Sequence, residues 1–205
     1  MPGSPAKLDI PRCVHAVPEN LKTLPPDSDV IRTPRLLLVP MTPDFMRALI
    51  AGQPERAAGL AGFAMPSETL IPKWVLELRL RTVEADPSLQ PWLLRSIVLR
   101  ESGTMVGDIG FHDRPGAQYL REFCDFGVEM GYSIAPEHRR QGYAGEALRG
   151  MIDWARGHHD VRSFILSINP TNAPSLRMAA AMGFQKVGAH EDDIDGPEDI
   201  YLLDL

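Results

Sequence analysis

The chain has 205 residues, of which 44% are hydrophobic and 23% are charged, and its formal net charge at pH 7 is −6. This composition is typical of a globular protein with a sizeable core, and the acidic balance argues against a general binder of nucleic acid or of anionic membranes. The sequence has only two cysteines, no apolar run of the roughly 18 residues that a membrane span needs and no apolar signal-peptide core. We therefore expect a cytoplasmic protein with no nucleic-acid or membrane partner.

Residues 1–29 contain six prolines and no sustained hydrophobic periodicity, a composition typical of an extended or partly ordered arm. Strand and helix patterns begin at Val30 and continue to the end of the chain. The sequence thus predicts a Pro-rich N-terminal arm over 1–29 and one domain over 30–205.

The domain opens with "VIRTPRLLLVP", Val30–Pro40, whose apolar run predicts a strand. Thr42 and Pro43 follow as the N-cap and the first residue of a predicted helix. A second helix is predicted over 72–86, and we expect its Trp74 to lie in the core or on the wall of a cleft.

Three strands are predicted in the middle of the chain, at Trp92–Glu101, Thr104–His112 and Asp125–Ala135. Ser102-Gly103 is a hairpin-turn signal between the first two. A helix is predicted after the third strand, over 142–156, with one apolar face.

The last third continues the alternation of strand and helix. A strand is predicted over 161–168 and a helix over 172–182, which Asn172 caps and Gly183 ends. Two antiparallel strands are predicted at the C-terminal end. This order of elements predicts a mixed α/β sheet rather than a regular doubly wound one.

The segment from Ile134 to Gly145 places two arginines, Arg139 and Arg140, before a helix that starts at Gly142. The first turn of a helix presents unbonded N–H groups and about half a positive charge, and glycine lets a phosphate approach the backbone. The nucleotide patterns GxxxxGK[ST] and GxGxxG are both absent. The segment therefore predicts a phosphate site of another kind.

What remains is Arg139-x-x-Gly142-x-Ala144. It resembles the coenzyme A pyrophosphate loop of the GNAT superfamily of N-acetyltransferases, whose pattern is Q/R-x-x-G-x-G/A after a strand. Three further segments resemble the ribosomal-protein alanine N-acetyltransferase (Rim-type) branch of that superfamily: "TPRLLLVPMTPDF", "VEMGYSIAPEH" and "NPTNAPSLRMAAAMGFQKVG". Together the four segments follow the family's order from about Val30 to Leu205.

The resemblance implies the GNAT fold, of the α/β (α+β) class. Its central sheet is mixed and mostly antiparallel, has about seven strands flanked by helices, and is split between the fourth and fifth strands. The resemblance also implies acetyl-CoA as co-substrate, with no metal. The residues that it assigns to cofactor binding are Tyr132, Ser133 and Ile134 through strand backbone groups, Arg139, Arg140, Gln141, Gly142, Tyr143, Ala144 and Gly145 in the pyrophosphate loop, and Asn172 at the next helix.

The catalytic residues follow the family pattern less closely. The position of the usual tyrosine acid, four residues before the Gly-Phe pair, holds Ala179, and a position that carries a glutamate base in some relatives holds Ser167. We expect Glu129 to act as the base, with a solvated or ion-paired strand residue as the alternative. Ser175 could relay a proton to the thiolate or simply hydrogen-bond backbone, and His112 could orient an acceptor or be a surface loop histidine.

The sequence therefore predicts an N-acetyltransferase that moves acetyl to a primary amine by direct attack in a ternary complex. The acceptor could be a protein N-terminus or a small amine, and a homodimer is possible. A CoA-binding regulatory module without catalysis and a nucleotide-phosphate binder are the competing hypotheses. Neither "HHD" at 158–160 nor the acidic run 191–199 has the spacing of a metal site.

Overall fold

The computed structural model describes residues 30–66, 71–192 and 196–205. The predicted N-terminal arm, 1–29, lies outside these residues, as does part of the acidic run 191–199. No helix in the described ranges is both long and apolar enough to cross a membrane.

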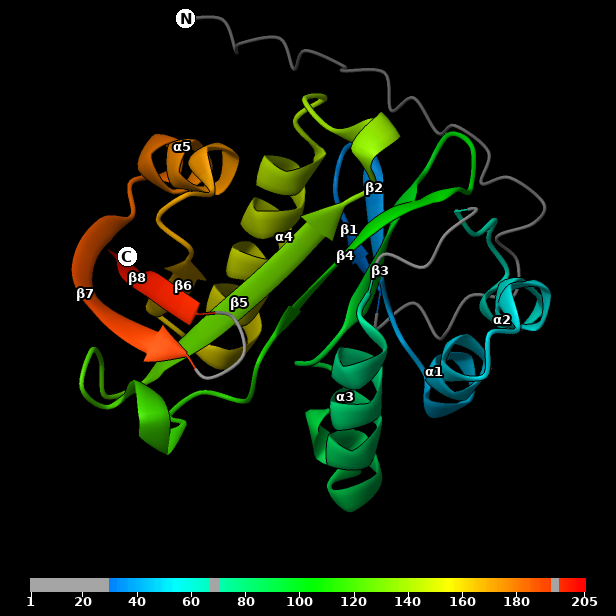
Figure 1. Ribbon diagram of the computed structural model, residues 1–205, viewed down its shortest axis with the longest axis horizontal. Coiled ribbons are helices and arrows are strands. Elements are labelled where there is room, and N and C mark those ends of the chain that lie inside the picture. The colour runs from blue at the N-terminus through cyan, green and yellow to red at the C-terminus, as the bar shows by residue number, and fades with distance from the viewer. Residues whose placement is uncertain (1–29, 67–70, 193–195) are drawn as a thin grey trace, which may run out of the picture.

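The described chain forms one sheet and five α-helices, in the order β1 (Ile31–Arg32), β2 (Leu36–Pro40), α1 (Pro43–Ile50), α2 (Pro54–Ala61), α3 (Lys73–Ala85), β3 (Arg95–Leu99), β4 (Met105–Phe111), β5 (Gly127–Ile134), α4 (Tyr143–His159), β6 (Ser163–Ile168), α5 (Ala173–Met182), β7 (Gln185–Asp192) and β8 (Gly196–Asp204). The strand order is β1-β2-β3-β4-β5-β6-β8-β7, and every pair is antiparallel except β5–β6. Figure 1 shows α5, β7 and β8 at one end of the molecule and α1 and α2 at the other. The predicted mixed, mostly antiparallel sheet is confirmed.

The sheet has eight strands where about seven were expected, because the first predicted strand is two. The amide of Thr33 donates to the carbonyl of Leu36 at 3.0 Å, which closes a tight turn inside Val30–Pro40. Ile31 then pairs antiparallel with Leu38. The apolar run Leu36–Val39 continues into the sheet as β2.

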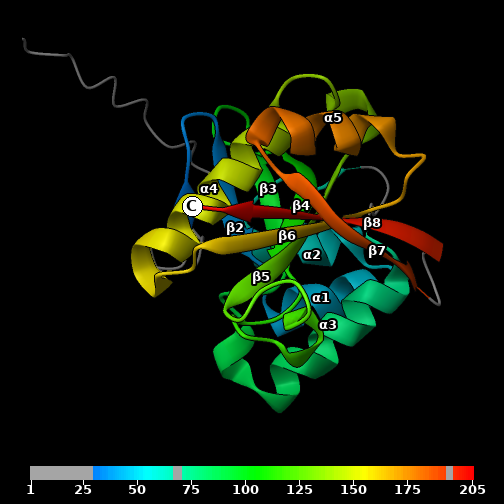
Figure 2. The ribbon, with the colours of Figure 1, turned by 90° about the vertical axis from the view of Figure 1, so that its left-hand side faces the viewer.

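Side chains of β2 alternate between two buried cores, one on each face of the sheet. Leu36 and Leu38 pack with residues of α4 and α5, whereas Leu37 and Val39 pack with residues of α1, α2 and α3. Figure 2 shows these two layers, with α5 above the sheet and α1 and α3 below it. This alternation explains why β2 is apolar throughout: a central strand covered on both faces has no solvent side.

Helix boundaries follow the capping signals in the sequence. Thr42 Oγ1 accepts the amide of Phe45 at the start of α1, and Asn172 Oδ1 accepts the amide of Ser175 at the start of α5. Gly183 ends α5 in the left-handed conformation, with φ of 89°. These predicted caps are confirmed.

Two features of the α1–α3 side differ from expectation. The helix α2 was not predicted, because Ala57 is its only buried residue and it therefore shows no apolar stripe. Trp74 lies at the surface of α3 with 42% of its area exposed, so it is not a core residue.

Candidate functional site

The sheet opens between β5 and β6. These parallel strands pair only from Gly127↔Ser163 to Glu129↔Ile165, while β5 continues beside β4 from Met130 to Ile134. The rest of β6 pairs with β8. Beyond Glu129 the edge of β5 that faces β6 therefore has no strand partner among the described residues, as the predicted split requires.

The backbone groups that face this split can be identified by alternation along β5. The Glu129 carbonyl accepts the amide of His112, and the Ala135 amide donates to Val106, so the odd-numbered residues turn their backbone groups toward β4. Met130, Tyr132 and Ile134 consequently turn theirs toward the split. The backbone roles predicted for Tyr132 and Ile134 stay predictions, and the Ile134 carbonyl already accepts Nε of Arg139.

Ser133 does not match its predicted role. Its backbone faces β4, where it pairs with Asp108, and its hydroxyl hydrogen-bonds the Asp108 carboxylate. Its backbone is therefore not available to a ligand in the split.

The loop from Arg139 to Gly142 leads from the end of β5 into α4. Arg140 and Gly142 both have left-handed backbones, with φ of 61° and 80°. Arg139 Nε donates to the Ile134 carbonyl at 2.9 Å, which ties the loop to the strand. Successive turns of this kind, ahead of a helix N-terminus, direct several N–H groups to one place and form an anion-binding concavity.

The first turn of α4 places the remaining loop residues. Tyr143 and Ala144 are partly buried, while Gly145 is buried against α5. A Cβ on Gly145 would lie 3.1 Å from Met178 Sδ, so this glycine permits the close approach of α4 and α5. Gln141 is exposed, and its backbone carbonyl is held by Arg35.

Ser175 and Tyr132 meet between α5 and β5. Tyr132 Oη donates to Ser175 Oγ at 3.2 Å, and both side chains are partly buried. Burial raises the pKa of Tyr132, which keeps its hydroxyl protonated. Asn172, one turn earlier, is exposed and uses Oδ1 to cap α5.

Glu129 lies at the point where β5 and β6 part, and it is only 8% exposed. Ser167 Oγ reaches it from β6 and donates to Oε1 at 2.5 Å. On the other side, Nδ1 of His112 lies 3.2 Å from Oε2. The carboxylate therefore joins the two diverging strands and the end of β4.

This environment decides the charge of Glu129. Burial by itself would raise its pKa, but the hydrogen bond and charge of His112, with hydrogen bonds from Ser167 and Tyr119, lower the pKa to about 2. A carboxylate with so low a pKa accepts a proton poorly at neutral pH. The ion-paired alternative fits these contacts, and the base role expected for Glu129 stays a prediction.

The sequence left His112 between orienting an acceptor and lying in a surface loop, and it did not predict the pairing of His112 with Glu129. Its side chain is 40% exposed, its carbonyl accepts Nη1 of Arg79 at 2.8 Å, and its Nε2 lies near Gly131, on the part of β5 that borders the split. Glu129 and His112 are 17 positions apart, and only the register Phe111↔Met130 brings them together. No spacing rule in the sequence signals such a pair.

A model of the acetyltransferase (GNAT) domain family matches residues 35–185. The chain belongs to the GNAT acetyltransferase family. Of the curated proteins, the uncharacterized N-acetyltransferase p20 of Bacillus licheniformis is 26% identical over 99 residues, which are 47% of this chain and 51% of the relative. The matches to curated relatives span about half of those relatives' own length.

Solved structures share the GNAT fold across most of the chain. A putative ribosomal-protein-serine acetyltransferase from Vibrio cholerae has a TM-score of 0.59 at 19% identity, covering 86% of this chain and 97% of its own. The ribosomal L7/L12 alpha-N-protein acetyltransferase RimL, in complex with coenzyme A, has a TM-score of 0.59 at 16% identity and covers 86% and 98%. At these identities the two structures show the shared fold.

Ala179, at the position of the usual GNAT tyrosine acid, is fully buried in the core beneath α5. No hydroxyl can therefore act from this position. Ser175, four positions earlier on α5, does carry a hydroxyl, and Tyr132 of β5 donates a hydrogen bond to it. In the described ranges no group of three or more His, Cys, Asp or Glu side chains is arranged to hold a metal ion.

Proposed function

We propose that this protein is an acetyl-CoA-dependent N-acetyltransferase that transfers acetyl to a primary amine by direct attack in a ternary complex. The observation that carries the proposal is the Glu129–His112 pair, which lies where β5 and β6 part. In a member of the GNAT family, that position puts a paired carboxylate and histidine beside an open strand edge and a helix N-terminus.

The donor is assigned to the split and the loop. Coenzyme A is bound in the RimL structure, which has the same fold. In our proposal the amides of Tyr132 and Ile134 hold the pantetheine arm, and the segment Arg139–Gly145 holds the diphosphate. Asn172 contacts the cysteamine end.

The acceptor must first lose a proton, because an alkyl ammonium with a pKa near 10 is mostly charged at neutral pH. Glu129 holds Nδ1 of His112, and so Nε2 is the ring nitrogen available to the acceptor. We assign His112 as the general base and Glu129 as the residue that positions it. In this assignment the carboxylate also stabilises the imidazolium that forms.

The neutral amine nitrogen then attacks the thioester carbonyl carbon. The carbonyl oxygen becomes negative and is stabilised by a backbone N–H of β5 that faces the split, that of Ile134 or a neighbour. As the oxyanion collapses, the C–S bond breaks and the attacking nitrogen loses its second proton, which Ser175, hydrogen-bonded by Tyr132, relays to the thiolate so that the serine hydroxyl is regenerated. The products are the amide, CoA thiol and one proton.

Two classes of acceptor fit this proposal. Both structural neighbours described above are named as ribosomal-protein acetyltransferases, which supports a protein N-terminal α-amine. Small amines are the other class. The carboxylates of Asp108 and Glu129 on the same face of the sheet would attract a cationic acceptor of either class.

The test is release of CoA thiol from acetyl-CoA in the presence of peptides with free N-termini and of small primary amines. We expect turnover with at least one amine, and a loss of about 100-fold or more in kcat/KM for H112Q. Binding of CoA without turnover on any amine would instead support a regulatory module. Stabilisation by ATP but not by CoA would support a nucleotide binder.

A further inference from the structure

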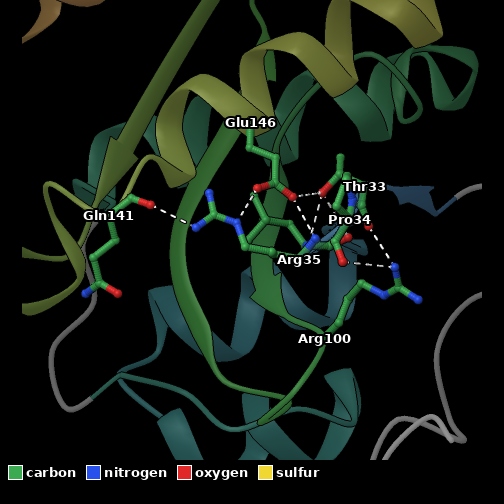
Figure 3. Close-up of polar contacts among 7 residues, drawn as sticks. Thr33, Pro34, Arg35, Arg100, Gln141 and Glu146 are labelled. Atoms are coloured by element: carbon green, nitrogen blue, oxygen red, sulfur yellow. Dashed lines mark hydrogen bonds and ion pairs between the residues drawn. The ribbon is translucent and has the colours of Figure 1, made fainter. Parts of the chain in front are cut away.

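The turn between β1 and β2 is bound to the first turn of α4 through one carboxylate. Thr33 Oγ1 and the amide of Arg35 donate to Oε1 of Glu146 at 2.6 and 2.7 Å, and Arg35 Nε donates to Oε2 at 2.6 Å. Figure 3 shows Glu146 reaching down to these donors. The Glu146 side chain is 12% exposed. Burial opposes its ionisation, but these hydrogen bonds and the charge of Arg35 lower its pKa overall, so it is a carboxylate.

The other end of the Arg35 guanidinium lies along the loop that precedes α4. Nη1 donates to the Gln141 carbonyl at 2.9 Å (Figure 3), and the guanidinium carbon lies 4.8 Å from the centre of the Tyr143 ring. A Cβ on Gly142 would lie 3.3 Å from Nη2. Arg35 therefore contacts three consecutive loop residues as well as Glu146.

Arg100 holds the turn from the opposite side. Its Nη1 donates to the carbonyls of Thr33 and Pro34 at 2.8 and 3.2 Å, and its amide donates to the Arg35 carbonyl at 2.9 Å. The backbone that carries Arg35 is thus fixed to β3. We call Thr33, Arg35, Arg100, Gln141 and Glu146 the Arg35 cluster.

This geometry acts on the loop in two ways. A left-handed conformation at a non-glycine residue such as Arg140 is unfavourable and persists only where the surroundings hold it. Arg35 holds the next carbonyl, that of Gln141, and so fixes the peptide plane that also carries the amide of Gly142. In addition, the Glu146 carboxylate in the first turn of α4 would repel a diphosphate bound there, and the charge of Arg35 neutralises that carboxylate.

We propose that Arg35 is a positioning residue for acetyl-CoA: it holds the loop Arg139–Gly142 ready for the diphosphate and masks the charge of Glu146. This inference rests on the proposed function, because it assigns the diphosphate to the same loop. Arg35 itself need not touch the ligand.

The test compares R35M with wild type in calorimetric binding of CoA and in steady-state turnover. We expect R35M to raise the Kd for CoA and the KM for acetyl-CoA at least tenfold while kcat at saturation changes less than twofold. Turnover of S-acetylpantetheine, which lacks the diphosphate, is expected to keep its wild-type kcat/KM. R35K retains the charge, but its single ammonium group cannot bind Glu146 and Gln141 together as the planar guanidinium does. We therefore expect a smaller loss of affinity for CoA, about threefold.

Rescue separates charge masking from a purely structural role. The double variant R35M/E146Q is expected to recover part of the affinity for CoA but not all of it, because the carboxylate that Arg35 masks is gone while the Gln141 carbonyl is still not held. R47M is the matched control: Arg47 is 52% exposed and ion-paired with Glu84 at 2.5 Å, like Arg35 with Glu146, but it lies on α1. Its Kd for CoA is expected to be unchanged.

Three results would overturn the inference. These are an unaltered Kd in R35M, an equal loss with S-acetylpantetheine, or no recovery in the double variant, each in an assay where wild type binds CoA. Failure of wild type to bind CoA would overturn the proposed function and this inference with it. R35K gives an independent measurement if R35M does not fold.

Discussion

Two carboxylates on one face of the sheet are driven in opposite directions by their neighbours. Hydrogen bonds and charge lower the pKa of Glu129 to about 2, as described above. Burial raises the pKa of Asp108 to about 6, and the hydrogen bond from the hydroxyl of Ser133 opposes this rise. The first is therefore a permanent anion that can orient His112, and the second titrates close to neutral pH.

The division of labour between Glu129 and His112 can be tested by substitution. We expect H112Q to lower kcat/KM at pH 7.5 by about 100-fold or more, the range for loss of a general base, and E129Q to lower it only about tenfold. The measurement is kcat/KM for both variants with the best acceptor. A loss in E129Q as large as or larger than that in H112Q would restore Glu129 as the base.

Asp108 makes a prediction about stability and pH. Because its pKa rises from 3.8 to about 6 on folding, the unfolded chain releases this proton first as pH rises, and the folded state loses stability between about pH 4 and pH 6. Above pH 6.5 the free energy of unfolding of D108N should therefore exceed that of wild type by up to about 3 kcal/mol. This difference in the free energy of unfolding should shrink as the pH falls toward 4. Urea unfolding at several pH values measures this. A difference that does not change with pH would contradict it.

At the scale of elements, α4 depends on the backbone at its N-terminus. Gly142 has φ of 80°, and an added Cβ would lie 3.3 Å from Arg35 Nη2. A side chain in this region costs about 1–2 kcal/mol, so G142A should distort the loop and raise the Kd for CoA about tenfold.

Gly157 supplies the control within the same helix. It has no left-handed backbone, and a Cβ there meets nothing within 4 Å. G157A is expected to stabilise the protein by about 0.5–1 kcal/mol and to leave the Kd for CoA unchanged. Equal Kd values for G142A and G157A would show that the conformation of Gly142 does not matter for binding.

Elements were predictable from sequence where a local signal defines them. Thr42, Asn172 and Gly183 mark helix ends because each acts through its own side chain or backbone. The break inside Val30–Pro40 was missed although bonds between Thr33 and Leu36 close the turn locally, because β1 has only two residues and gives no strand pattern of its own. Contacts with Glu146 and Arg100 hold the same turn from distant parts of the chain. The helix α2 was missed because it buries a single alanine.

At the scale of the whole molecule, the part of the site assigned to acetyl-CoA was easier to predict than the part assigned to the acceptor amine. The loop Arg139–Gly145 is continuous in sequence, and its glycine and helix start are local features. The pair Glu129–His112 and the bond from Ser167 depend on strand register across β4, β5 and β6, which no single segment encodes. For the same reason Arg35 was read only as part of a strand, although it contacts the loop more than 100 residues later.

The central claim is that acetyl-CoA binds in the split between β5 and β6, with its diphosphate at the loop before α4. A crystal structure of the protein with coenzyme A tests this most directly. We predict the diphosphate on the amides of residues 140–145, and the pantetheine arm along Met130–Ile134 with its sulfur toward Ser175. A diphosphate bound away from Gly142, or an arm that does not enter the split, would contradict the account.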